Sequence, residues 1–180
     1  MPVVKSLSII YIEFWRGTPL ITILFMASVM LPLFFPSGVE FDKVVRAMIG
    51  ITLFQSAYTA EAVRGGLQAI DKGQSEASMA LGMGYWHQTI FIILPQALKI
   101  SIPSIVNTFI ALFKDTSLVS IIGLLDLLKI AQNSSRSLDW NGYDIEAYMF
   151  AGIVFWIFCF GMSMYSQRLE KKLDTDRRVE

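Results

Sequence analysis

The chain has 180 residues, of which 54% are hydrophobic and 17% charged, and its 15 basic and 15 acidic residues cancel to a formal net charge of zero. A soluble domain usually carries about 25% charged residues, and a neutral chain offers no electrostatic argument for nucleic-acid binding. Residues 17–39 and 147–167 contain no Asp, Glu, Lys or Arg, and each stretch reaches the roughly 20 residues that a helix needs to cross a bilayer. Composition therefore predicts a polytopic membrane protein, with buried core helices of a soluble protein as the alternative.

Four membrane helices are predicted in an all-α fold, separated by turn and charge signals. The first ends at the turn sequence Pro36-Ser37-Gly38, and the second ends near Arg64-Gly65-Gly66. The third contains Pro95 and Pro103, and a proline inside a spanning helix kinks it and frees carbonyl groups that protein or water must satisfy. We expect the four spans at residues 18–35, 44–63, 89–113 and 147–165.

The other segments are predicted to lie at the membrane surfaces. Residues 118–128 are apolar but short and are interrupted by Asp126, so we expect a partial or re-entrant helix on the outer side. A polar loop over residues 132–146 follows it. We expect a single transmembrane domain over residues 1–166, with a polar loop at about 67–95, and a charged, helical tail over 167–180.

Basic residues are more numerous on one side of this predicted topology than on the other. By the positive-inside bias, the richer side is cytoplasmic, so the loop at 67–95 and the C-terminus are predicted to face the cytoplasm. The tail supplies five of these residues. The full set on this side is Lys5, Arg16, Arg64, Lys72, Arg168, Lys171, Lys172, Arg177 and Arg178.

The loop between the second and third spans is predicted to hold a short surface helix. Residues 74–81 are strong helix formers, and Ser75 or Gly73 could cap their start. Glu76 would then fall in the first turn, where a negative charge complements the helix dipole. A linker helix that merely rests on the lipid surface is the alternative.

The residues after Glu76 suit a surface on which another protein docks. Small side chains at Ala77, Ser78 and Ala80 leave low relief, so a partner could approach closely. Glycines 82 and 84 would end the helix, and the aromatic pair at 85–86 could anchor at the headgroup level. The chain then returns to the bilayer at Leu94-Pro95.

These residues resemble the EAA loop of the membrane subunits of bacterial ABC importers, in which Glu-Ala-Ala is followed by three residues, Gly, nine residues and Ile-x-Leu-Pro. Glu76-Ala77-Ser78, Gly82 and Ile92-Ile93-Leu94-Pro95 match it, with Ser78 in place of the third-position Ala. Further segments are similar to the polar amino-acid branch of this family, and residues 25–32 and 155–162 are most similar to its broad-range L-amino-acid permeases. The branch-specific segments are residues 11–20, 60–66, 72–74, 95–97 and 114–118.

The resemblance implies a permease subunit of an importer in the bacterial inner membrane, which is not itself an enzyme. A cytoplasmic ATPase would receive the loop through Glu76 and Gly82, with Ala77, Ser78 and Ala80 packing closely and Leu94 and Pro95 completing the coupling segment. ATP and Mg²⁺ would be held by that partner, and this sequence contains no Gly-x-x-x-x-Gly-Lys-Ser/Thr phosphate loop. The resemblance further implies a second permease subunit, identical or related, and a periplasmic amino-acid-binding protein.

One departure from the family pattern concerns the N-terminal end. Family members usually place a complete membrane helix before the segment at 11–20, whereas only residues 1–10 precede it here. We therefore expect an N-terminally truncated permease. The alternative function is a remnant of such a permease that does not transport.

Polar residues inside the predicted spans are candidates for the translocation pathway. Glu61 and Arg64 lie one helical turn apart, so they can pair on one helix face; they belong either to a gate or to an interfacial anchor. An amino acid is a zwitterion, and Asp115 could accept from its ammonium group. Thr116 or Ser117 would assist Asp115, and Gln55 and Asn107 are predicted on facing spans, with polar capping as the alternative role.

Other classes of protein fit the sequence less well. An enzyme would need a catalytic or metal-binding group of residues, but the only histidine, His87, and the only cysteine, Cys159, fall in different segments. An ATP-independent channel or secondary transporter is the remaining alternative, because such proteins also use broken helices. It would leave the spacing from Glu76 to Pro95 unexplained.

Overall fold

The computed structural model describes residues 2–36, 41–138 and 140–178, with side chains described up to residue 173, and these residues form helices and no strand. The predicted turn residues Ser37 and Gly38 lie outside the described residues. The α-helices are α1 (Pro2–Arg16), α2 (Leu20–Val29), α3 (Lys43–Gln68), α4 (Lys72–Ala80), α5 (Tyr85–Gln88), α6 (Leu94–Asp115), α7 (Leu127–Ser135) and α8 (Asp144–Arg178). Two 3-10 helices, η1 (Leu31–Phe34) and η3 (Thr116–Ile122), and one π-helical turn, η2 (Thr89–Ile93), complete the fold.

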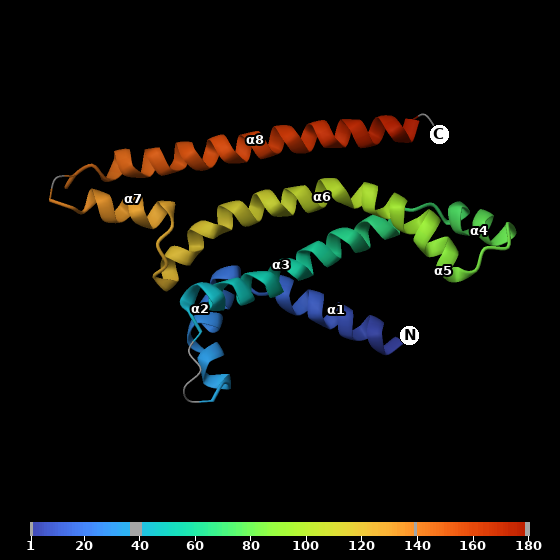
Figure 1. Ribbon diagram of the computed structural model, residues 1–180, viewed down its shortest axis with the longest axis horizontal. Helices are drawn as coiled ribbons and strands as arrows, with labels where there is room; N and C mark the ends of the chain where they lie inside the picture. Colours follow the sequence, from blue (N-terminus) through green and yellow to red (C-terminus); the bar gives the residue numbers. More distant parts are fainter. Residues whose placement is uncertain (1, 37–40, 139, 179–180) are drawn as a thin grey trace.

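Three long helices form the body of the protein, with α6 packed between α3 and α8 (Figure 1). At one end of this body lie α4 and α5, together with the start of α1 and the end of α8. At the opposite end lie α7 and the start of α8. The loop predicted at residues 67–95 is therefore separated from the α7 end by the length of the long helices.

Two helical segments of the described chain are long and apolar enough to cross a membrane, at Tyr85–Ile122 and Asp144–Leu173. The pair α1 and α2 makes a third if it counts as one broken span. Helix α3 has 26 residues, about 39 Å at 1.5 Å per residue, but polar residues such as Gln55 and Glu61 make it less apolar than these segments. The all-α membrane fold is confirmed.

The first predicted span, at 18–35, is not one straight helix. Helices α1 and α2 meet at 96°, and α2 has only 10 residues before η1 begins. Pro19 precedes α2 in an extended conformation, with φ −63° and ψ 137°. Because proline disfavours the helical conformation at the residue before it, the chain breaks at Thr18. Helix α1 itself was not predicted.

The second predicted span also ends in a different place. Helix α3 continues through Gly65 and Gly66 to Gln68 as one helix. Gly66 is buried against α6, where an added Cβ would lie 2.5 Å from the carbonyl oxygen of Ala97. Close packing of the two helices thus offsets the low helix propensity of glycine.

The partial helix predicted at 118–128 is replaced by η3 and α7, which meet at a turn. Gly123 has φ +84°, and Asp126 accepts a hydrogen bond from the Lys129 amide at 2.8 Å. Asp126 therefore caps the start of α7 and does not interrupt a helix. The predicted polar loop is shorter than expected, because its first residues belong to α7 and its last to α8. Helix α8 continues without a break to Arg178, so the tail up to this residue is helical as predicted.

A small apolar core holds α2 across the N-terminal half of α3. Leu24 is 1% exposed, and an added Cβ on Gly50 would lie 3.1 Å from that of Ala27. Glycine and alanine here let the two helices approach closely. The buried members of this core are Leu20, Ile23, Leu24, Ala47, Phe54 and Ile122.

Candidate functional site

The predicted surface helix is α4, and it begins two residues earlier than expected. Asp71 is its N-cap, and its carboxylate accepts a hydrogen bond from the Gly73 amide at 2.8 Å. The predicted caps Ser75 and Gly73 are therefore wrong, since both lie inside the helix. Glu76 consequently lies in the second turn, where the helix dipole acts more weakly than in the first.

The C-terminus of α4 is closed by a Schellman motif centred on Gly82. The Met83 amide donates to the Ser78 carbonyl oxygen at 3.1 Å, and the Gly82 amide donates to the Met79 carbonyl oxygen at 2.9 Å. Gly82 has φ +77°, the left-handed conformation that this motif requires and that glycine adopts without strain. The predicted break at Gly82 is confirmed, and its physical reason is the cap.

Ser78 lies on the inner side of α4 and not on a docking surface. Its side chain is buried, with 1% exposure, and its hydroxyl donates to the Ser75 carbonyl oxygen at 2.9 Å. The neighbouring Gln88 is also buried and donates to the Ser75 hydroxyl. Ser78 therefore does not form part of the exposed surface of α4, and its role in coupling stays a prediction.

The outer surface of α4 combines small residues with exposed apolar ones. Glu76, Ala77 and Ala80 are exposed, as a docking surface requires. Met79 and Leu81, which the sequence analysis did not select, are 57% and 81% exposed. Large apolar side chains that flank small ones offer a partner both anchoring area and space for close approach. Met79 and Leu81 interrupt the run of small residues in the sequence, and this interruption could have identified them as part of the surface.

The segment after α4 leads into the long helix through the π-helical turn η2. Tyr85 and Trp86 are 72% and 71% exposed and contact each other edge to face, with ring centroids 5.5 Å apart. Leu94 and Pro95 are the first two residues of α6, directly after η2. The predicted return to the bilayer at Leu94-Pro95 thus lies within a continuous helical segment, Tyr85–Ile122.

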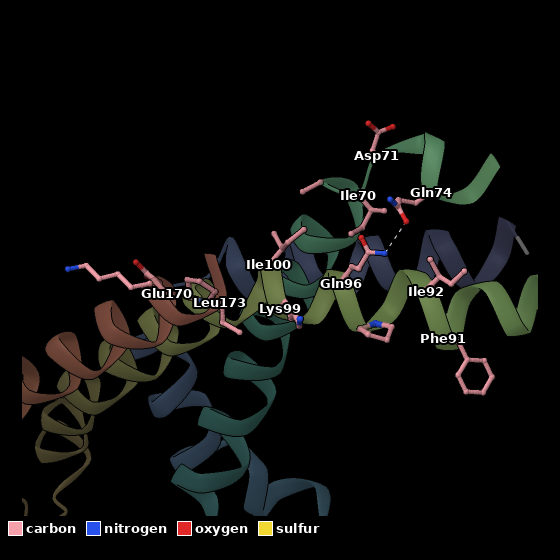
Figure 2. Close-up of a pocket in the computed structure, with 14 residues that line it drawn as sticks. Ile70, Asp71, Gln74, Phe91, Ile92, Gln96, Lys99, Ile100, Glu170 and Leu173 are labelled. Atoms are coloured by element: carbon pink, nitrogen blue, oxygen red, sulfur yellow. Dashed lines mark hydrogen bonds between the residues drawn. The ribbon is translucent and has the colours of Figure 1, made fainter. Parts of the chain in front are cut away.

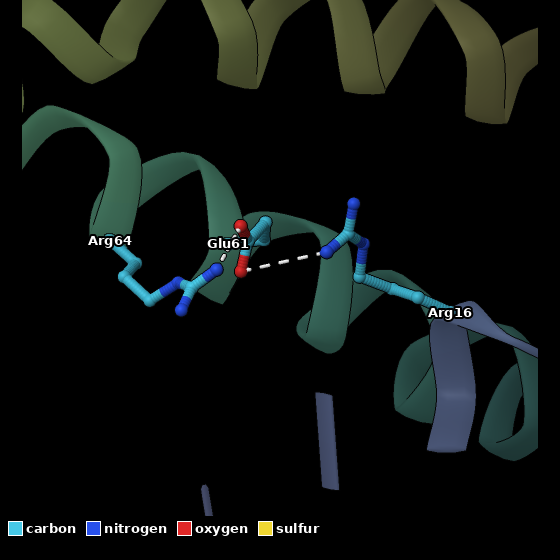
Figure 3. Close-up of polar contacts among 3 residues, drawn as sticks. All are labelled: Arg16, Glu61 and Arg64. Atoms are coloured by element: carbon cyan, nitrogen blue, oxygen red, sulfur yellow. Dashed lines mark hydrogen bonds and ion pairs between the residues drawn. The ribbon is translucent and has the colours of Figure 1, made fainter. Parts of the chain in front are cut away.

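An ionic cluster joins α3 to the bend between α1 and α2 (Figure 3). Glu61 accepts from Arg64 at 2.7 Å, which confirms the predicted pairing. Its other carboxylate oxygen lies 3.6 Å from Arg16, whose guanidinium group lies 5.7 Å from the ring centroid of Tyr58. Arg16 ends α1, about 22 Å along the helix from Pro2. Arg16 therefore lies in the same ionic cluster as Arg64, and its place on the cytoplasmic side stays a prediction.

Asp115 lines a cavity of about 540 Å³ that also contains Arg16, Thr18 and Tyr58. An acid and a base in one cavity can bind the two ends of a zwitterion. Thr116 and Ser117 do not line the cavity, and their hydroxyl groups donate to the carbonyl oxygens of residues 113 and 114 at 2.7 and 2.8 Å. No local sequence pattern connects Asp115 with Arg16, because they are almost 100 residues apart.

Of the two amides predicted on facing spans, Gln55 lies at the contact between α3 and α6. The Gln55 amide donates to the Thr108 carbonyl oxygen at 3.4 Å, which confirms that the two helices face each other here. Asn107 is exposed on α6. Neither residue lines the cavity that contains Asp115.

The two candidate residues for an enzyme remain apart. His87 lies on α5 and stacks on Phe91, with ring centroids 6.0 Å apart, whereas Cys159 is half-buried in α8. Within the described part of the chain, no three His, Cys, Asp or Glu side chains are grouped as metal ligands.

Comparison with known proteins gives one consistent result. Residues 2–175 match the model of a family described as "binding-protein-dependent transport system inner membrane component". The chain is 60% identical over 177 residues to the inner membrane amino-acid ABC transporter permease protein YhdY of Escherichia coli (strain K12), with 98% of this chain and 48% of that protein covered. It is 54% identical over 179 residues to the glutamate/glutamine/aspartate/asparagine transport system permease protein BztC of Rhodobacter capsulatus, with 99% and 41% covered.

A solved structure shares the fold. The chain matches the crystal structure of an amino acid ABC transporter with histidines at a TM-score of 0.85 and 30% sequence identity, over 96% of this chain and 78% of that one. The chain spans about half the length or less of the two curated relatives above.

Proposed function

Because the chain belongs to the family of binding-protein-dependent transport system inner membrane components, we propose that it is a membrane-spanning permease subunit of an ATP-driven importer of L-amino acids. Its relatives in this family are permeases of amino-acid transporters. Helix α4 and the C-terminus would face the cytoplasm, since most basic residues lie at that end. ATP and Mg²⁺ would be bound by a separate ATPase.

The observation that carries this proposal is the outer surface of α4. Asp71 and Gly82 fix both ends of the helix, so the exposed surface that contains Glu76, Met79 and Leu81 is held in one orientation. A capped helix of this kind is suited to insertion into a cleft of a partner. The partners would be cytoplasmic ATPase subunits, a second permease subunit and a periplasmic amino-acid-binding protein.

Co-purification of the ATPase tests the proposal. The tagged chain, produced with the transporter subunits of its own operon, should retain the ATPase in detergent, and Glu76→Lys should reduce the retained fraction at least fivefold because it reverses a charge at the interface. Glu146→Lys is the matched control, since Glu146 is equally an exposed acid but lies at the opposite end of the protein. Retention of the ATPase by the Glu76 variant, or no ATPase with the wild-type chain, would contradict the proposal and favour an ATP-independent transporter.

We further propose that Asp115 and Arg16 contact the substrate. They line the same cavity, and an amino acid presents an ammonium group to an acid and a carboxylate to a base. Asp115→Asn keeps the shape of the side chain and removes its charge, so uptake of labelled amino acids should fall about tenfold or more while the ATPase still co-purifies. Thr116→Val is the control, because the Thr116 hydroxyl is bonded to its own helix. An unchanged substrate affinity in the Asp115 variant would exclude this role.

A further inference from the structure

Two side-chain hydrogen bonds connect α4 to the long helix that follows it. Gln88 donates to the Ser75 hydroxyl, and the Gln96 amide donates to the Gln74 side-chain oxygen at 3.2 Å (Figure 2). Gln74 and Ser75 are adjacent in α4, whereas Gln88 and Gln96 are eight residues apart on the segment Tyr85–Ile122. Neighbouring residues of α4 are thus attached at two separate points of one helix.

The turn between these two attachment points is π-helical. It spans Thr89–Ile93, and the Leu94 amide donates to the Thr89 carbonyl oxygen, five residues earlier. Pro95 explains the widening, because it has no amide hydrogen for the Phe91 carbonyl oxygen and its ring would collide with that group in a regular α-helix. Single π-helical turns inside α-helices are frequently found at functional sites.

A π-helical turn can relax by moving its extra residue along the helix. When the extra residue moves out of this turn, the turn becomes α-helical. The helix beyond it then rotates by about 100° relative to the helix before it, since an α-helix has 3.6 residues per turn. The side chains at this turn have room for such a movement, because Phe91, Ile92 and Gln96 line a cavity of about 1280 Å³. Phe91 is 68% exposed.

We propose that Gln88 and Gln96 are positioning residues that make the π-helical turn follow α4. A displacement of α4 then acts on both ends of the turn, so it rotates α6 and is not absorbed by the loop between α4 and α5. Since Asp115 ends α6, this rotation reaches the proposed substrate cavity. The inference rests on the proposed function, in which an ATPase moves α4.

The ratio of ATP hydrolysed to amino acid transported is the measurement that isolates this role. In the complete transporter reconstituted in proteoliposomes, Gln96→Leu keeps the size of the side chain but removes its hydrogen bond to Gln74. We expect the ratio to rise about threefold to tenfold, as suits the loss of one neutral hydrogen bond, with the ATPase still bound. Gln68→Leu is the matched control on α3, because its amide makes no hydrogen bond among the described residues.

Further variants separate a positioning role from a merely structural one. The double variant Gln74→Leu/Gln96→Leu should be no worse than either single one, because both remove the same bond. Gln74→Glu should remain coupled, since it retains an acceptor for Gln96. If Gln96→Leu does not accumulate in the membrane, the same ratio of ATP hydrolysed to amino acid transported is measured for Ser75→Ala. This variant removes only the oxygen to which Gln88 donates.

An unchanged ratio in Gln96→Leu and Ser75→Ala, in a transporter whose wild-type form imports amino acids, would overturn the inference and leave the proposed function intact. A wild-type chain that neither binds an ATPase nor supports uptake would instead contradict the proposed function. The two failures are therefore distinguishable in the same preparation.

Discussion

At Gly82, the backbone angle decides which side chains are tolerated, because no atom lies within 4 Å of an added Cβ. The residue has φ +77°, and its amide closes the Schellman motif. Steric hindrance in this conformation costs about 1–2 kcal/mol for an ordinary L-residue, but asparagine adopts it more readily. The role of Gly82 can therefore be tested by changing the residue without filling any space in the protein itself.

We predict that binding of the ATPase falls in the order Gly82, Gly82→Asn, Gly82→Ala, Gly82→Val. A cost of about 1 kcal/mol for alanine should lower the fraction of correctly capped α4, and with it the apparent affinity, about fivefold. The measurement is the amount of ATPase retained by each tagged variant. If asparagine were instead as harmful as valine, Gly82 would act by leaving space for the partner, and the cap would not explain the motif.

Residue contacts could be predicted from the sequence only where they are local. Glu61 and Arg64 are three residues apart in a helix, so their pairing follows from helix geometry alone. The contact between Glu61 and Arg16 depends on the 96° bend after α1, and no local pattern gives the direction in which the chain continues after such a bend. The burial of Ser78 was likewise not predicted, because it depends on how the chain folds back after α4.

At the scale of helices, two adjacent glycines of α3 have opposite environments. An added Cβ on Gly66 would lie 2.5 Å from the Ala97 carbonyl oxygen and would also collide with Ser101, whereas one on Gly65 would meet no atom within 4 Å. Ala97 and Ser101 are themselves buried, with 0% and 1% exposure. The approach of α3 to α6 is therefore set by a small-residue contact at this one level.

We predict that Gly66→Ala and Gly65→Ala change stability in opposite directions. The first forces the two helices apart and should destabilise the protein by about 1–3 kcal/mol. The second raises helix propensity without a clash and should stabilise it by about 0.5–1 kcal/mol. Thermal unfolding of the two purified variants in detergent measures both. Equal shifts of Tm would show that helix propensity outweighs packing at both positions.

The same glycines show why the end of α3 could not be predicted from the sequence. Helix propensity places a boundary near Arg64-Gly65-Gly66, but the packing partner that offsets it lies on α6, some thirty residues later in the chain. Conversely, Pro19 separates α1 from α2 because its effect is local to the backbone. Apolar length alone identified the spans within Tyr85–Ile122 and Asp144–Leu173, since a bilayer sets that length directly.

At the scale of the whole molecule, the long helices separate two chemically different ends. One end carries α4, α5 and the start of α1, and the other carries α7 and the start of α8. Arg16 and Arg64 share Glu61, so these two basic residues belong to one ionic cluster. The basic tail of α8 lies at the α4 end and favours that end as cytoplasmic.

This orientation predicts opposite labelling of the two ends. Because Cys159 is the only cysteine, Cys159→Ala gives a background in which one new thiol reports one position. His87→Cys on exposed α5 should react with a membrane-impermeant maleimide in inside-out vesicles and not in intact spheroplasts. Ser137→Cys, exposed beyond α7, should show the reverse. Both variants must still support uptake, so that the labelled chains are folded ones. Reaction of the two thiols from the same side would contradict the separation of α4 and α7 across the bilayer, and a swap of the two patterns would place the proposed ATPase surface outside the cell.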